Sequence, residues 1–113
     1  MSGRLPVHLL VSALIRRVDA EGGSAAVLAR GDPGSGSLLI VCRERGAIVS
    51  LLESATGFDG RLAVRPASTA ESFTESDLAD LLSRRRRFDP DLWLIELDVA
   101  GAERFAAETI SSN

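Results

Sequence analysis

Apolar residues near the start of the chain recur with the period of an α-helix. They fall three and four residues apart and so form one stripe, made of Val7, Leu10, Val11, Leu14, Ile15 and Val18. Pro6 precedes this stripe, where a proline suits the beginning of a helix, and the pair Gly22-Gly23 follows it, where glycine favours a left-handed stop. The pattern predicts an amphipathic helix over residues 7–20.

Short apolar runs then alternate with turn residues, which is typical of β-structure. The runs 25–29 and 38–42 are separated by a glycine-rich segment with Asp-Pro-Gly at its centre, and this predicts a β-hairpin. Both faces of the run 38–42 are apolar, so we expect it to be a central strand. A third strand over 47–52 and a weaker fourth over 61–65 would complete an antiparallel meander.

A second helix and a strongly patterned strand follow, with a sharp stop between them. Thr74 can cap a helix and Asp77 approximates a capping box, so a helix is predicted over about 75–88. Pro90 has no backbone donor and restricts the residue before it, so the helix has to end there. In the strand predicted over about 92–99, alternate residues share a core face, namely Trp93, Ile95, Leu97 and Val99.

These elements predict an α+β fold in a single domain that spans residues 1–113. The N-terminal amphipathic helix packs on a mainly antiparallel sheet of four or five strands, and the second helix leads into a buried strand. A short helix over 101–107 and frayed residues 109–113 are expected after that strand. A chain of 113 residues is long enough to bury one hydrophobic core without a disulfide.

Composition and charge exclude several classes of function. The formal net charge of −3 gives no general attraction to nucleic acid or to an anionic membrane. The chain contains no lysine, which excludes a lysine Schiff base and a P-loop lysine. Cys42 is the only cysteine, so neither an intramolecular disulfide nor a thiolate metal cluster can form, and a cytoplasmic location is the simplest interpretation. The apolar start, residues 1–15, is too short to span a bilayer and is a poor signal peptide.

Four consecutive arginines are the most conspicuous candidate site, namely Arg84, Arg85, Arg86 and Arg87. Arg85 lies within the apolar stripe that runs from Leu78 to Phe88, so its guanidinium has to form an ion pair or extend to water, whereas the other three arginines can reach water. The nearest carboxylates in the sequence are Asp89, Asp91 and Glu96. One interpretation is a solvated helix end with a structural ion pair, and the other is a site for an anion or an acidic protein partner.

The carboxylates that follow the arginines could also carry chemistry. Asp89, Asp91, Glu96 and Asp98 could bind a metal ion or act as general acid and base, although a solvated strand face explains them more simply. His8 has no partner evident in the sequence, and neither has Cys42. The glycine-rich segment lacks the spacing of a phosphate-binding loop. We therefore assign no catalytic residue, no metal ligand and no cofactor.

Three stretches of the chain together resemble a known family. They are residues 5–17, which begin Leu-Pro-Val-His, residues 31–36, which begin Gly-Asp-Pro and end in Gly, and residues 87–96, Arg-Phe-Asp-Pro-Asp-Leu-Trp-Leu-Ile-Glu. They are similar to a family of small bacterial proteins catalogued as domain of unknown function fourteen ninety-one. The likeness covers nearly the whole chain. It implies a stand-alone cytoplasmic domain and brings no established activity, cofactor or active-site residue.

Three functional hypotheses follow. The leading one is a non-catalytic binding or accessory module that self-associates, for example as a homodimer, or binds an unidentified protein partner, because strand edges need covering. The second is a small-molecule or metal-dependent enzyme that uses carboxylates of the 89–98 segment with Arg85. The third is weak nucleic-acid binding through residues 84–87. The net charge argues against the third, as does the presence of a single neighbouring aromatic, Phe88.

Overall fold

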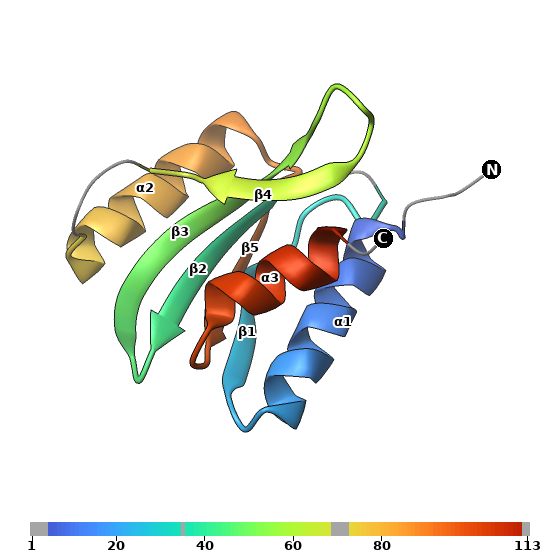
Figure 1. Ribbon diagram of the computed structural model, residues 1–113. Helices are drawn as coiled ribbons and strands as arrows, with labels where there is room; N and C mark the ends of the chain where they lie inside the picture. The colour runs from blue at the N-terminus through green and yellow to red at the C-terminus, as the bar shows by residue number, and fades with distance from the viewer. Residues whose placement is uncertain (1–4, 35, 69–72, 112–113) are drawn as a thin grey trace.

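The computed structural model describes residues 5–34, 36–68 and 73–111 of the chain. Over these residues, three helices and five strands follow one another (Figure 1). In chain order they are α1 (Val7–Ala20), β1 (Ser24–Ala29), β2 (Leu38–Glu44), β3 (Ala47–Thr56), β4 (Leu62–Pro66), α2 (Glu75–Phe88), β5 (Trp93–Asp98) and α3 (Ala102–Ser111). The predicted α+β class is confirmed, and the first two helices have the predicted bounds.

The strand order in the sheet is β1-β5-β2-β3-β4. β5 pairs antiparallel with β1 and parallel with β2, whereas β2, β3 and β4 form an antiparallel meander. The predicted hairpin between β1 and β2 is therefore wrong, because β5 lies between them. Four of the six residues of β5 are buried and none of the six in β1 is, so β5 gains more from the central place, where helices cover both faces.

The glycine-rich segment between β1 and β2 is a crossover rather than a hairpin turn. We call residues 30–37 the crossover loop. It passes the start of β5, where the amide of Asp32 donates to the carbonyl of Asp91 (3.0 Å) and the amide of Trp93 donates to the carbonyl of Ser37 (2.8 Å). A Cβ atom on Gly31 would collide with the Asp91 carbonyl, and so would one on Gly36. Glycine is needed at both positions because two backbone segments approach so closely.

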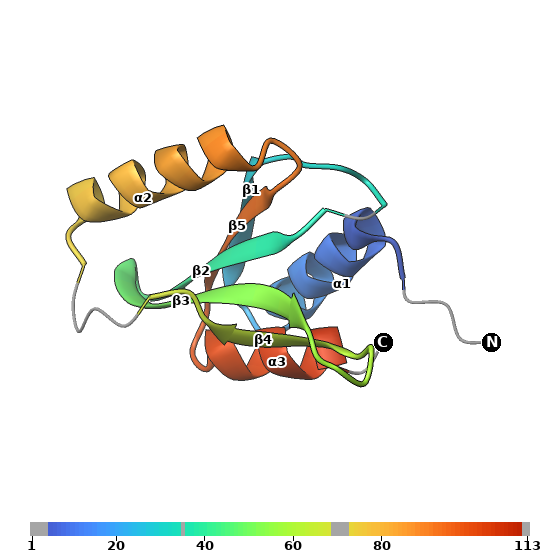
Figure 2. The ribbon, with the colours of Figure 1, turned by 90° about the horizontal axis from the view of Figure 1, so that it is seen from above.

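Helices cover both faces of the sheet (Figure 2). α1 and α3 lie on one face, where buried residues form one large cluster that includes Leu14, Ile40, Trp93 and Phe105. α2 lies alone on the opposite face, above two clusters of only three buried residues each. The core is thus deep on the α1/α3 face and shallow on the α2 face.

The signals that begin and end α2 act as the sequence predicted. The hydroxyl of Thr74 accepts from the amide of Asp77 (3.0 Å), and the Asp77 carboxylate accepts from the amide of Thr74 (3.1 Å), which completes a capping box. The helix ends at Phe88, just before Pro90. The placement of Phe88 on the apolar stripe is wrong: 82% of its surface is exposed, because it lies off the stripe that faces the sheet.

The end of α3 departs from the predicted fraying. Thr109 and Ile110 are buried, and Ile110 belongs to the core cluster on the α1/α3 face. Arg17 of α1 donates to the Thr109 hydroxyl and to the Glu108 carboxylate, each over 3.0 Å. Buried apolar contact and these two hydrogen bonds hold the last turn. Residues 112 and 113, which were also expected to fray, lie outside the described part of the chain.

Candidate functional site

Arg85 has an ion-pair partner, but not one that the sequence suggested. Its guanidinium donates to Glu53 of β3 over 2.9 Å, and Arg65 of β4 donates to the second oxygen of the same carboxylate over 2.8 Å. Neither Asp89, Asp91 nor Glu96 pairs with Arg85, because the inward stripe of α2 faces β3. Burial alone would raise the pKa of Glu53, but hydrogen bonds and charge from Arg65 and Arg85 outweigh it and leave that pKa below its ordinary value.

The prediction that Arg86 reaches into water is wrong. It is half-buried, and its guanidinium donates to the backbone carbonyls of Arg30 (2.9 Å) and Leu92 (3.1 Å). One carbonyl belongs to the crossover loop and the other to the residue before β5. Arg86 therefore joins the end of α2 to both segments, and its charge is directed to the backbone.

The Trp93 side chain also holds the crossover loop, at the residue that follows Gly31. It is 1% exposed, as its place on the predicted core face requires, and its indole Nε1 donates to the Asp32 carbonyl over 2.7 Å. The Arg30 guanidinium lies over the ring, 5.0 Å from its centroid. Arg86 and Trp93 thus fix the loop through carbonyls on either side of Gly31.

The predicted carboxylates do not converge. Asp89 forms the turn after α2, where its side chain accepts from the amide of Asp91, and Asp91 itself is exposed. Glu96 accepts from Arg43 over 2.6 Å, and Asp98 accepts from two backbone amides of the β2–β3 turn, each over 2.8 Å. In the described part of the chain, no three His, Cys, Asp or Glu side chains are grouped so that they could hold a metal ion.

Arg43 is a central ion-pair residue that sequence reasoning missed. Its guanidinium contacts Glu96 of β5 and also both carboxylate oxygens of Glu75, in the first turn of α2, at 2.7 and 2.8 Å. These hydrogen bonds lower the pKa of Glu75 and raise that of Arg43. An arginine that follows five buried residues in a central strand was the available signal, since such a group needs partners from its neighbours.

The remaining predicted residues do not form a chemical centre. Arg84 and Arg87 are exposed and make no hydrogen bond or ion pair with other described residues. His8 is exposed, and its Nδ1 lies 3.0 Å from the Pro33 carbonyl. Cys42 is fully buried, and burial raises the pKa of its thiol to about 11, so the thiolate is scarce at neutral pH.

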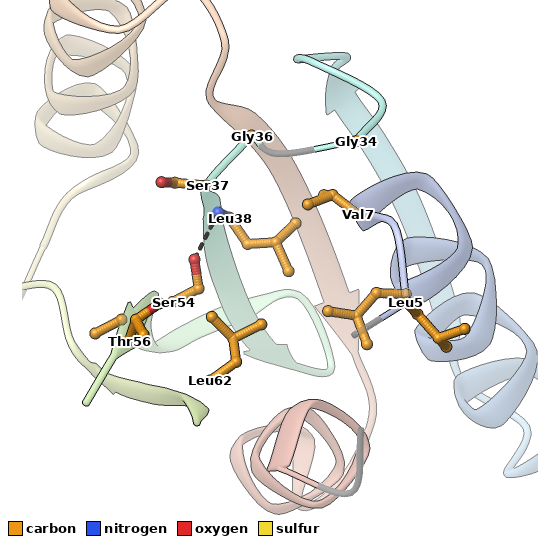
Figure 3. A pocket seen from close by; sticks show the side chains of 11 residues that line it. Leu5, Val7, Gly34, Gly36, Ser37, Leu38, Ser54, Thr56 and Leu62 are labelled. Atoms are coloured by element: carbon orange, nitrogen blue, oxygen red, sulfur yellow. Dashed lines mark hydrogen bonds between the residues drawn. The ribbon is translucent and has the colours of Figure 1, made fainter. Parts of the chain in front are cut away.

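A cavity of about 430 Å³ opens where α1 begins (Figure 3). The crossover loop forms one wall, and the ends of β3 and β4 form another. The described lining mixes apolar residues with glycines and small polar residues: Leu5, Val7, Leu10, Leu38, Ala55 and Leu62, with Gly34, Gly36, Ser37, Ser54 and Thr56. The sequence did not reveal this cavity, because its walls come from four segments that are far apart in the chain.

The first turn of α1 is not an anion site, although it lies beside this cavity. The amide of Val7 donates to the Gly34 carbonyl (3.3 Å), and the amide of His8 donates to the Pro33 carbonyl (3.0 Å). The amides of Leu9 and Leu10 both donate to the Pro6 carbonyl. The free donors that normally attract an anion to a helix start are therefore already occupied.

Fold and site together define a small α+β protein with a mixed five-stranded sheet, in which Arg43, Arg85 and Arg86 make internal contacts. None of the described residues that line its cavity is charged. A model of the family "Protein of unknown function (DUF1491)" matches residues 5–107, so the chain belongs to that family. This confirms the resemblance that the sequence suggested. None of the curated proteins matches the chain.

Solved structures of relatives have the same fold. A crystal structure of a DUF1491 family protein from Caulobacter crescentus CB15 is 31% identical, with 90% of this chain and 94% of that chain covered and a TM-score of 0.76. An NMR structure of a DUF1491 family protein from the same organism is also 31% identical, with 92% of this chain and 94% of that chain covered and a TM-score of 0.76. A solution structure of a protein from A. tumefaciens is 35% identical, covering 86% and 87% of the two chains with a TM-score of 0.68.

Among the described residues, none of the helices combines the length and the apolar character needed to cross a bilayer.

Proposed function

We propose that this protein is a non-catalytic binding module of the cytoplasm that self-associates through the outer edge of β1. The proposal rests on a contrast between the charged side chains, which are mostly engaged in contacts, and the edge of β1, which is uncharged and open. The charged groups that could have formed an active site are mostly engaged with one another and with the backbone, whereas the open edge of β1 contains no charged residue. Such a surface suits association better than catalysis.

The two edges of the sheet differ in how they are protected. β4 ends in Arg65 and Pro66, and both residue types block the addition of another strand. β1 has the sequence Ser-Ala-Ala-Val-Leu-Ala and pairs only with β5, so its outer backbone groups have no strand partner among the described residues. Leu28, at the irregularity in this pairing, is 45% exposed. A second copy could pair along this edge about a twofold axis.

Six residues of edge strand provide a small interface. Stable complexes bury about 1,600 Å² in total, and one pair of short strands buries less than this. We therefore expect weak association that depends on concentration, and we expect it to be detected by sedimentation velocity across micromolar to millimolar concentrations. A strict monomer throughout that range would contradict the proposal.

A charged substitution tests whether β1 is the interface. Leu28→Lys places a charge on the open edge and should give a monomer at every concentration. Leu9→Lys is the matched control, because Leu9 is similarly exposed (43%) but belongs to helix α1. If Leu28→Lys associates like the unmodified protein, β1 is not the interface.

Nucleic-acid binding is a second candidate, favoured by the exposure of Arg84 and Arg87. It predicts that affinity for a single-stranded oligonucleotide falls steeply with salt and disappears when both residues are changed to alanine. A flat salt response would exclude it. The enzyme hypothesis gains no support from this geometry, because Asp89, Asp91 and Glu96 lie apart and none of them lines the cavity.

A further inference from the structure

The cavity at the start of α1 has a rigid frame. Its floor includes Leu10 and Leu38, both 1% exposed, which belong to the large core cluster. Its loop wall is held by the hydrogen bonds from Trp93 and Arg86 and by the amides of α1 that donate to Pro33 and Gly34. These hydrogen bonds hold the described residues of the wall at several points, which lowers the cost of ordering the wall when a ligand binds.

Among the described residues, the lining combines apolar side chains with backbone and hydroxyl groups, and none of its side chains is ionisable. Figure 3 shows the side chains of Val7, Leu38 and Leu62 directed into one space from α1, β2 and β4, whereas Ser37 points away from it. A charged ligand would lose its hydration here without gaining a partner of opposite charge, which is unfavourable. The occupant that fits this lining is therefore neutral, with both apolar and hydrogen-bonding groups.

One polar group at the edge of the space restricts the ligand further. The Ser54 hydroxyl accepts from the amide of Leu38 over 2.9 Å, as Figure 3 shows. A hydroxyl also carries a proton that it can donate. A ligand with a carbonyl, ether or hydroxyl oxygen could accept this proton while its apolar part fills the space beyond.

The volume sets the size of the ligand. A dry apolar cavity of about 150 Å³ holds one benzene molecule, and the cavity here, about 430 Å³, is nearly three times larger. It lies in the range of small-molecule sites, roughly 300–1,000 Å³. It is too small for a packed helix and large enough for a fused-ring compound or a medium-length alkyl chain.

We propose that this cavity is a binding site for a neutral small molecule that combines an apolar part with a hydrogen-bond acceptor. Leu5, 42% exposed at the rim, is the residue that such a ligand would cover. This site is separate from the β1 edge, so it does not depend on self-association.

Nile red, a neutral fluorescent molecule with one carbonyl, is the probe for the test. The protein should bind it saturably in the micromolar range, with a blue-shifted emission. Leu5→Glu should weaken binding by about tenfold, because it puts a charge at the apolar rim. Leu9→Glu is the matched control, because Leu9 is 43% exposed one turn further along and does not line the cavity. The affinity of this variant for Nile red should differ from that of the unmodified protein by less than about twofold.

Two competitors and one deletion distinguish a neutral ligand from other possible occupants of the cavity, which are a charged ligand, the start of this chain and a second copy of the protein. Decanol should displace Nile red, and decanoate should do so about tenfold less well, because the lining offers no cation. Lack of saturable binding, equal effects of Leu5→Glu and Leu9→Glu, or preference for decanoate would overturn the proposal. Binding that appears only after deletion of residues 2–4 would also overturn it, in favour of the start of the chain as the occupant. Binding that disappears when the protein self-associates would identify a second copy instead.

Discussion

The end of α2 and the cavity at the start of α1 lie on either side of the crossover loop, but they are built from opposite chemistry. At the end of α2, Arg86 holds the loop through backbone carbonyls, and Arg30 covers the Trp93 ring. At the cavity, none of the lining residues that the structure describes is charged. Two of the four consecutive arginines, Arg85 and Arg86, therefore support the fold, whereas the side of the loop that faces the cavity offers a surface for a ligand.

The loop can serve both regions because its glycines allow close approach. Gly31 and Gly36 pass against the Asp91 carbonyl, where a larger residue would collide, and Gly36 also lines the cavity. The family resemblance rested partly on these residues and on the run from Arg87 to Trp93. The structure gives that pattern a physical reason, since the run and the loop form a single packed unit.

Replacement of Trp93 should have the largest effect, because both regions depend on this side chain. Trp93→Ala removes a fully buried indole and its hydrogen bond to Asp32, so we expect a loss of about 3–5 kcal/mol in the free energy of unfolding. Urea unfolding measures this loss. A change below about 1 kcal/mol would show that the loop is held by other contacts.

Arg86→Ala should have the next largest effect and should separate support from solvated charge. It removes hydrogen bonds from a charged group to two backbone carbonyls, and we expect a loss of about 1–3 kcal/mol. Arg87→Ala is the control, because Arg87 is exposed, and its stability should change by less than about 0.5 kcal/mol. Equal effects of the two substitutions in urea unfolding would contradict the distinction drawn here.

Acid should weaken the contact between α2 and the sheet. The pKa of Glu53 is lower in the folded protein than in the unfolded chain, where a glutamate has a pKa of about 4.3. Its stabilising contribution is complete above that value and is lost as the pH falls through the folded pKa. Glu53→Gln should therefore be less stable than the unmodified protein at neutral pH, and the difference in unfolding free energy should shrink in acid.

The control for this pH dependence is Glu44→Gln. Glu44 is exposed at the end of β2 and makes no ion pair with other described residues. The free energy of unfolding of the Glu44→Gln variant should follow that of the unmodified protein at every pH. A constant difference between Glu53→Gln and the unmodified protein from neutral pH into acid would refute the role given to the Glu53 carboxylate.

Local patterns predicted the elements of the fold well, whereas long-range pairing could not be predicted. The stripe of α1, the capping box of α2, the stop at Pro90 and the inward Trp93 all depend on residues close in sequence. The place of β5 between β1 and β2 depends on which strands gain most from burial, which is a property of the whole sheet.

The same limit applies to the candidate site. Arg85 was expected to form an ion pair or extend to water and it forms an ion pair, but Glu53 lies 32 residues away on a strand that the helix crosses. The cavity forms only when four separate segments meet, so no single motif marks it. The arginine run and the carboxylates were conspicuous because they are contiguous in sequence, whereas their contacts are set by the tertiary structure.

Leu5→Glu should have the smallest effect on stability. Leu5 is at the rim and exposed, so we expect the free energy of unfolding to change by less than about 0.5 kcal/mol even though Nile red binding falls. Urea unfolding of this variant beside Leu9→Glu provides the check. A large loss of stability would mean that Leu5 supports the fold, and the loss of binding would then have a different cause.

Arg85 and Arg86 support the fold while the cavity accepts a ligand, and one NMR titration tests this claim most directly. Amide chemical shifts of the unmodified protein are followed as Nile red is added. The account predicts that the shifts centre on the cavity, at Val7, Leu38, Ser54 and Leu62, and that Arg84 and Arg87 do not move. Shifts that centre on Arg84 and Arg87 and leave the cavity unchanged would contradict it.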